Sequence, residues 1–227
     1  MALWTIGDLH LAHSTDKPMD VFGERWCGHS QKIKDFWMRH VKDEDTVVIP
    51  GDISWAINLE EAREDLLYLH QLPGRKILLK GNHDYWWETV SKMQKFLAQL
   101  EIDDIFFLQN NHYVYEDYAI CGTRGWALEG EDWQRLIARE TGRLELSLKS
   151  APSDKEKIVF LHYPPIYSDD ACTSMIELMQ AYGVKQCFYG HLHGISIKNA
   201  VVGENFGINF SIVSADSLDF CLYNILK

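Results

Sequence analysis

The sequence predicts a layered α/β fold, and three observations support this prediction. The 227 residues are 46% hydrophobic and 24% charged, which is the composition of a globular chain with a packed core. Strand-like runs of β-branched and aromatic residues alternate with amphipathic helical patterns as far as Tyr189. Beyond Tyr189 the pattern changes to strands alone. Alternating strands and helices indicate sheets covered by helices, and we expect the last strands to complete the sheets in antiparallel orientation.

The predicted strands are short and are bounded by Gly, Asp or Asn. They cover Leu3–Ile6, Thr46–Ile49, Lys76–Leu79, Ile105–Leu108, Ala119–Cys121, Ile158–Leu161 and Gln186–Tyr189, followed by Ile195–Val202, Gly207–Ser214 and Phe220–Ile225. The predicted helices carry apolar residues at i, i+3 and i+4 and cover Ser30–Val41, Leu59–His70, Trp86–Leu100, Glu131–Ser150 and Cys172–Tyr182. The long aperiodic segment Ala12–His29 is interpreted as a loop at the rim of a site.

Size, charge and cysteine content narrow the class of protein. A chain of this length buries roughly 70% of its unfolded surface, so we expect one domain over residues 1–227. The net charge of −11 disfavours binding to a nucleic acid duplex. Five cysteines, never closer than 15 residues, predict no disulfide framework and favour the cytoplasm. No basic leader precedes the first strand and no apolar run approaches ~18 residues, so neither export nor a membrane span is expected.

Polar residues of metal-binding types directly follow five of the predicted strands. Side chains placed there converge, because the carboxyl ends of the strands of an α/β sheet open onto one crevice. Two aspartates, one asparagine and four histidines form a mixed oxygen and nitrogen set that suits Mn, Fe or Zn. Seven ligands exceed the needs of one ion and would serve two ions that share a carboxylate. The candidate ligands are Asp8, His10, Asp52, Asn82, His162, His191 and His193.

Each motif on its own has an ordinary structural explanation. An Asp-x-His or His-x-His pair after a strand is usually a capped turn or a surface polar pair, and Gly-Asn-His-Asp is also a good turn sequence. Five such elements at five strand ends favour a common site instead. Glycines directly precede four ligand positions, and we expect them to let the backbone bend sharply out of its strand. They are Gly7, Gly51, Gly81 and Gly190.

The five motifs together resemble the signature of the calcineurin-like metallophosphoesterases. That signature runs D-x-H, G-D, G-N-H-D/E, a lone His and G-H-x-H. Its counterparts here are Asp8-Leu9-His10, Gly51-Asp52, Gly81-Asn82-His83-Asp84, His162 and Gly190-His191-Leu192-His193, in the same order over residues 7 to 193. The resemblance extends to the small phosphohydrolases of bacterial type and implies a four-layer α/β/β/α sandwich.

The resemblance also implies a role for each motif position. Two divalent transition-metal ions are implied, with Mn as the first choice and Fe, Zn or Ni as alternatives. Asp52 would bridge them, and a bridging hydroxide would attack phosphorus. His83 would stay outside the metal shell and protonate the leaving group. The first ion would be held by Asp8, His10 and His193, and the second by Asn82, His162 and His191.

Two departures from the family pattern affect these expectations. Many members carry an acidic residue three positions after the bridging Asp, where it can orient the catalytic His, but Trp55 stands there in this chain. The partner that orients His83 is therefore open, and Asp84 is adjacent but points the opposite way on extended backbone. Many serine/threonine phosphatases of the family also carry an Arg after G-D, which residues 53–56 lack. A phosphoprotein phosphatase is thus not the first choice.

The function expected from these features is hydrolysis of a phosphate mono- or diester of a small substrate. Arg124, which lies between glycines after a strand, and His13 and His29 in the rim loop are candidate substrate contacts, with surface ion pairs as the alternative. Other functions stay open: a nucleotide-sugar or lipid pyrophosphatase, a nuclease of the same superfamily, or a non-catalytic binding scaffold. The complete ligand set favours an enzyme over a scaffold, and the charge opposes a nuclease. The sequence leaves the oligomeric state open.

Overall fold

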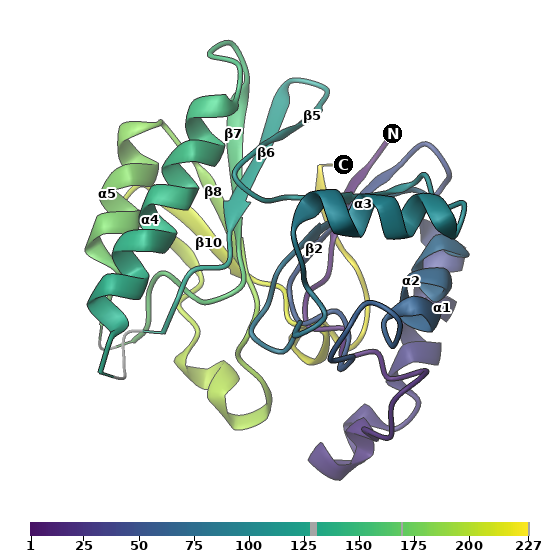
Figure 1. Ribbon diagram of the computed structural model, residues 1–227. Helices are drawn as coiled ribbons and strands as arrows, with labels where there is room; N and C mark the ends of the chain where they lie inside the picture. Colours follow the sequence, from purple (N-terminus) through teal and green to yellow (C-terminus); the bar gives the residue numbers. More distant parts are fainter. Residues whose placement is uncertain (128–130, 169, 227) are drawn as a thin grey trace.

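Two β-sheets stacked face to face lie between two layers of helices, as Figure 1 shows. The computed structural model describes residues 1–127, 131–168 and 170–226. The first sheet has the strand order β11-β1-β2-β3-β4, and the second has the order β5-β6-β7-β8-β10-β9. This arrangement confirms the predicted α/β fold and its four layers.

The strands of each sheet are parallel except at the sheet edges. The first sheet contains β1 (Leu3–Thr5), β2 (Thr46–Pro50), β3 (Arg75–Leu79), β4 (Ile105–Phe107) and the antiparallel β11 (Tyr223–Leu226). The second contains β6 (Tyr118–Thr123), β7 (Glu156–Leu161), β8 (Gln186–Tyr189) and β10 (Ile208–Ile212), with β5 (Tyr113–Tyr115) and β9 (Gly203–Asn205) antiparallel at its edges.

The prediction of an antiparallel completion is correct for β11 and wrong for β10, and the antiparallel β9 was not predicted. Strand β10 pairs with β8 in parallel. The chain reverses in a short hairpin between β9 and β10, so β10 runs antiparallel to β9 and in the same direction as β8. The strand predicted at Ile195–Val202 is also wrong, because residues Gly194–Asn199 form a 3₁₀ helix, η3. There the hydroxyl of Ser196 accepts a 2.9 Å hydrogen bond from the His193 N–H and turns the chain.

Helices α1 (His29–His40), α2 (Arg63–His70) and α3 (Val90–Gln99) cover the first sheet, and α4 (Trp133–Ser150) and α5 (Thr173–Ala181) cover the second. Helix α3 begins later than the predicted Trp86, because Thr89 caps it by accepting a hydrogen bond from the Lys92 N–H. The rim segment carries two 3₁₀ helices, η1 (Met19–Phe22) and η2 (Glu24–Trp26), and η4 spans Ala215–Leu218. None of the helices in the described ranges is both long and apolar enough to cross a membrane.

Three hydrophobic clusters separate the four layers. Side chains alternate along the strands, so Val47 and Leu78 pack against the helices, whereas Val48 and Ile77 pack between the two sheets. A third cluster fills the space between the second sheet and helices α4 and α5. Because both faces of each sheet are covered, the strands read as nearly continuous hydrophobic runs.

The two sheets meet where their parallel strands end. Gly7, after β1, forms a parallel bridge to Ser214, after β10, with a 2.7 Å hydrogen bond from the Gly7 N–H to the Val213 carbonyl. The parallel strands of both sheets therefore run in the same direction, and their carboxyl ends lie at one end of the molecule.

Candidate metal centre

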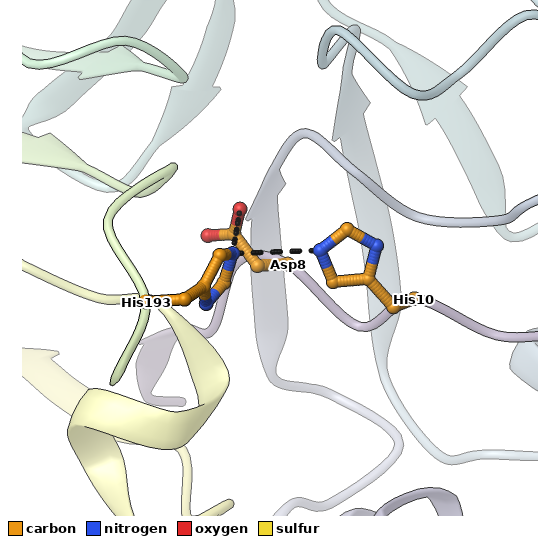
Figure 2. A group of neighbouring side chains, drawn as sticks. All are labelled: Asp8, His10 and His193. Carbon is orange, nitrogen blue, oxygen red and sulfur yellow. Dashed lines mark hydrogen bonds and ion pairs between the residues drawn. The ribbon is translucent and has the colours of Figure 1, made fainter. Parts of the chain in front are cut away.

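The first candidate ligand group joins the two sheets. His193 Nε2, from the second sheet, lies 3.3 Å from Asp8 Oδ1 and 3.4 Å from His10 Nε2, both from the first sheet (Figure 2). Asp8 is fully buried and His10 is 3% exposed. These three side chains present their donor atoms close enough together to hold one metal ion.

The second group lies beside the first and also draws on both sheets. His162 Nε2 is 2.7 Å from Asn82 Oδ1, and His191 Nδ1 is 2.9 Å from the same oxygen. His162 Nδ1 is directed at the Pro50 carbonyl oxygen, 3.1 Å away, which orients the ring with Nε2 toward the site. The seven ligands expected from the sequence thus lie in one connected cluster.

Asp52 lies between the two groups. Its Oδ2 is 3.8 Å from His10 Nε2 and 3.5 Å from His162 Nε2. Its Oδ1 accepts a 2.8 Å hydrogen bond from the His83 N–H, which fixes the carboxylate. This position matches the bridging role that the family resemblance implies.

The charges at the site fit divalent cations. Burial raises the pKa of Asp52 to about 9, and the carboxyl groups of Asp8 and Asp84 act in the same direction. Burial lowers the pKa of both His162 and His191 to about 3, so both rings are neutral near pH 7, the form in which imidazole binds metals. His10 Nδ1 is buried and has no hydrogen-bond partner among the described residues. Crowded carboxylates beside imidazoles, two of them neutral, are a donor set that suits transition metals.

Four of the ligands adopt the left-handed backbone conformation. The φ angles are 58° at Asp8, 45° at His10, 50° at Asp52 and 72° at His191. Non-glycine residues rarely hold such angles, and those that do are concentrated at functional sites.

The glycines that precede the candidate ligands differ in backbone conformation and surroundings. Of the four, only Gly51 has a positive φ, at 95°. Gly81 and Gly190 instead provide space, because a Cβ at Gly81 would collide with the backbone and carboxylate of Asp52, and one at Gly190 would collide with the carboxylate of Asp8. The ligand residues themselves make the sharp bends.

His83 faces the centre without joining either ligand group. Its Nε2 lies 4.0 Å from Asp52 Oδ2, and its Nδ1 is buried with no partner in the described parts of the chain. Trp55 packs on the His83 ring at a centroid distance of 4.4 Å and stacks on the His10 ring at 4.9 Å. The residue that departs from the family pattern thus holds His83 by ring contact.

Asp84 has a structural role. The fully buried carboxylate accepts hydrogen bonds from the N–H groups of Gly81 (2.7 Å), Ile53 (2.9 Å) and Ser54 (3.2 Å), and from the Trp86 indole (3.1 Å). It therefore ties together the two loops that carry Asp52 and Asn82. Asp84, the residue after His83, therefore stabilises these loops and does not orient the His83 ring.

Sequence reasoning missed Asp216. Its Oδ1 lies 2.8 Å from His193 Nδ1, and its Oδ2 accepts a 2.8 Å hydrogen bond from the Gly194 N–H. Burial lowers the pKa of His193, but Asp8 and Asp216 outweigh this effect and raise it to about 10. A carboxylate on the far nitrogen of a histidine ligand orients the ring and increases its basicity. The signal was present, since Asp216 follows the predicted strand Gly207–Ser214 as the candidate ligands follow their strands.

The three candidate substrate contacts differ in their surroundings. His13 Nδ1 lies 2.7 Å from Asp65 Oδ1, outside the ligand cluster. His29 is 9% exposed, and its Nε2 lies 3.0 Å from the Leu9 carbonyl oxygen, so its ring faces the protein interior. Arg124 is half-buried, and its guanidinium lies over the ring of Trp126, 4.4 Å from the centroid.

A cavity of about 270 Å³ opens beside His83 and is lined mainly by apolar side chains. The rim segment supplies Met19, Phe22 and Trp26, and Trp55, whose indole N–H lies 3.1 Å from Met19 Sδ, adds to the apolar lining. His10 and His193 of the first candidate ligand group also line it. The segment interpreted from the sequence as a rim loop therefore borders the site.

Several solved structures share the fold of this chain. A protein of unknown function from Aquifex aeolicus, AQ665, matches with a TM-score of 0.55 and 18% identity, covering 98% of this chain and 95% of its own. The phosphopantetheinyl hydrolase PptH from Mycobacterium tuberculosis matches with a TM-score of 0.58 and 12% identity, covering 99% and 95%. TT1561 from Thermus thermophilus matches with a TM-score of 0.53 and 11% identity, covering 84% and 81%. At these identities the likeness shows the fold alone.

Sequence comparisons give two further matches, one to a phage protein and one to a family model. A stretch of 85 residues is 36% identical to the Gene 66 protein of Mycobacterium phage D29. That stretch is 36% of this chain, and it spans only 40% of the length of the phage protein. A family model for the calcineurin-like phosphoesterases matches residues 1–194, which include all seven candidate ligands and His83. The chain therefore belongs to the calcineurin-like phosphoesterase family.

Proposed function

We propose that the protein is a dinuclear metal-dependent phosphohydrolase that acts on a phosphate mono- or diester of a small substrate. One observation carries the proposal: two ligand groups lie side by side, and Asp52 Oδ2 lies between His10 and His162. In this proposal Asp52 is shared by both ions. The first ion is held by Asp8, His10 and His193, and the second by Asn82, His162 and His191.

The chemistry divides between the ions and the chain. When bound, two divalent cations, which we take to be Mn with Fe, Zn or Ni as alternatives, would neutralise phosphate oxygens and lower the pKa of a water molecule. The chain positions the phosphate against them through buried, fixed ligands. His83 holds a proton on Nε2, the nitrogen directed at the centre, and delivers it to the leaving oxygen.

The leaving group lies in the apolar cavity next to His83. Trp26, Trp55 and Phe22 form its walls and keep bulk water from the leaving oxygen. We also propose a cytoplasmic location, which the five free cysteines support.

Metal content and activity test the proposal together. The purified protein is expected to contain about two Mn ions per chain by elemental analysis and to hydrolyse p-nitrophenyl phosphate or its diester. Asp52→Asn is expected to lower the metal content and abolish hydrolysis, whereas the exposed control Asp43→Asn keeps both. Full metal content and activity in Asp52→Asn would refute the shared ligand.

His83 is tested by the leaving group. His83→Ala is expected to keep both ions and to lose roughly 10²- to 10⁴-fold in kcat on alkyl phosphates, whose leaving groups need a proton. On p-nitrophenyl phosphate the loss is expected to be much smaller, because p-nitrophenolate is stable as an anion. Equal losses on both substrates would remove the general-acid role, and a drop to one ion per chain would make His83 a ligand.

A further inference from the structure

A second cavity, of about 430 Å³, lies next to the candidate metal centre at the carboxyl ends of β3 and β6. None of the seven candidate ligands lines it. It is nevertheless adjacent to them in the chain and in space. Lys80, on its wall, stands two residues before Asn82, and the backbone carbonyl of Arg124 accepts a 3.1 Å hydrogen bond from the His162 N–H.

The wall of this cavity is rich in positive charge, although the protein as a whole carries −11. Two carboxylates also line it, and both have other partners. The fully buried Glu140 lies 2.7 Å from Arg143 and 3.5 Å from Arg139, and Glu88 lies 3.3 Å from Lys92. The cations on the wall are Lys80, Arg124, Arg139 and Arg143.

Two of these cations lack a direct ion-pair partner among the described residues. No carboxylate within the described residues lies at ion-pair distance from Lys80 or Arg124. The guanidinium of Arg124 is held over Trp126, and its Nε is buried without a hydrogen-bond partner in the same residues. Burial and the charge of Arg124 both lower the pKa of Lys80, and the opposing charges of Asp84 and Glu140 do not offset this effect.

We propose that this cavity binds a phosphate group of the substrate other than the one that is hydrolysed. Phosphate fits the groups present, because a guanidinium donates two parallel hydrogen bonds to its oxygens and a lysine adds a point charge. The inference rests on the proposed function and names its substrate class: small compounds with two phosphate groups. One phosphate, a diester, lies at the metal centre with its leaving group in the apolar cavity beside His83, and the other, on the substituent that is not released, lies between Lys80 and Arg124.

Binding of inert phosphonates tests this without turnover. The probes are alkane-α,ω-bisphosphonates of increasing length and the matching alkyl monophosphonates, titrated calorimetrically into the Mn-loaded protein. The bisphosphonate of matching length is expected to bind at least tenfold more tightly than its monophosphonate. Arg124→Ala is expected to remove this advantage without changing monophosphonate binding. Arg135→Ala, which removes an exposed cation from the same helix as Arg139, is expected to keep it.

A titration of inorganic phosphate into the chelated, metal-free protein tests whether the cavity binds an anion independently of the metal centre. Binding that weakens about tenfold or more in Arg124→Ala and in Lys80→Ala, but not in Arg135→Ala, locates an anion in the cavity even if the protein hydrolyses nothing. If phosphate binds there but no bisphosphonate gains affinity, the cavity takes free phosphate and the substrate proposal is wrong. Phosphate binding unchanged by Arg124→Ala, in a variant whose thermal unfolding matches the native protein, overturns the site itself.

Discussion

Asp84 provides the sharpest test of how the loops of the site are held. Asp84→Ala leaves four buried donors without their acceptor: the N–H groups of Ile53, Ser54 and Gly81 and the Trp86 indole. An unsatisfied buried donor costs ~1–3 kcal/mol. Burial raises the pKa of Asp84, so part of the loss is offset when the carboxyl is removed, and the lower end applies. The expected loss is about 4 kcal/mol, or roughly 8–16 °C in Tm for a domain of this size.

Thermal unfolding in the presence of a chelator measures this loss without a contribution from metal binding. Asp84→Asn keeps one oxygen but turns an amide N–H₂ toward a donor, so its Tm is expected to lie between those of the native protein and Asp84→Ala. The exposed Asp43→Ala serves as the control and is expected to shift Tm by no more than about 2 °C. A Tm for Asp84→Ala within about 2 °C of the native value would refute the conclusion that Asp84 holds the two loops together.

Three further predictions concern the site and its support. Asp216→Asn is expected to weaken metal binding 10- to 100-fold in chelator competition, because His193 loses its orienting carboxylate, and a change below twofold would contradict this. Gly190→Ala is expected to displace Asp8 and to cost roughly 1–3 kcal/mol, whereas Gly142→Ala, in open space on α4, is expected to stabilise by about 0.5–1 kcal/mol; chemical unfolding compares the two. The pKa of Asp45 is lowered by hydrogen bonds from Lys42, Ala2 and Trp4 despite burial, so its stabilisation is present above about pH 4 and lost as pH falls further. Asp45→Asn is thus expected to be less stable than the native protein at pH 7, with the gap closing in acid; a gap that stays constant would exclude the ionised carboxylate as its source.

The ligands were predictable because each stands directly after a hydrophobic strand. The strand-end rule alone predicted the meeting of Asp8, Asp52 and His162, and the structure brings these groups together. The same rule applied to Asp216 would have found it, but Ser-Ala-Asp-Ser reads as an ordinary turn. The family resemblance assigned the roles, which spacing alone does not contain.

Other features depend on contacts that no local pattern shows. Whether Asp84 or Trp55 supports His83 depends on the relative placement of two loops 30 residues apart. The strand predicted at Ile195–Val202 failed because a single hydroxyl, Ser196 Oγ, closes a 3₁₀ turn there. The direction of strand β10 depends on how many times the chain reverses after β8. The composition of the strand does not predict this direction, because it is the same for a parallel and an antiparallel strand.

The position of the ligands at the junction of the two sheets has a consequence for the lifetime of the protein. Donors from the first sheet face donors from the second, so each bound ion would fasten one sheet to the other as well as activate water. An ion at a hundred times its dissociation constant adds about 2.7 kcal/mol against opening. Scarcity of metal would therefore remove the proposed activity and loosen the same junction, which would expose the chain to proteases. Abundance of this protein in the cell would then follow the supply of its metal.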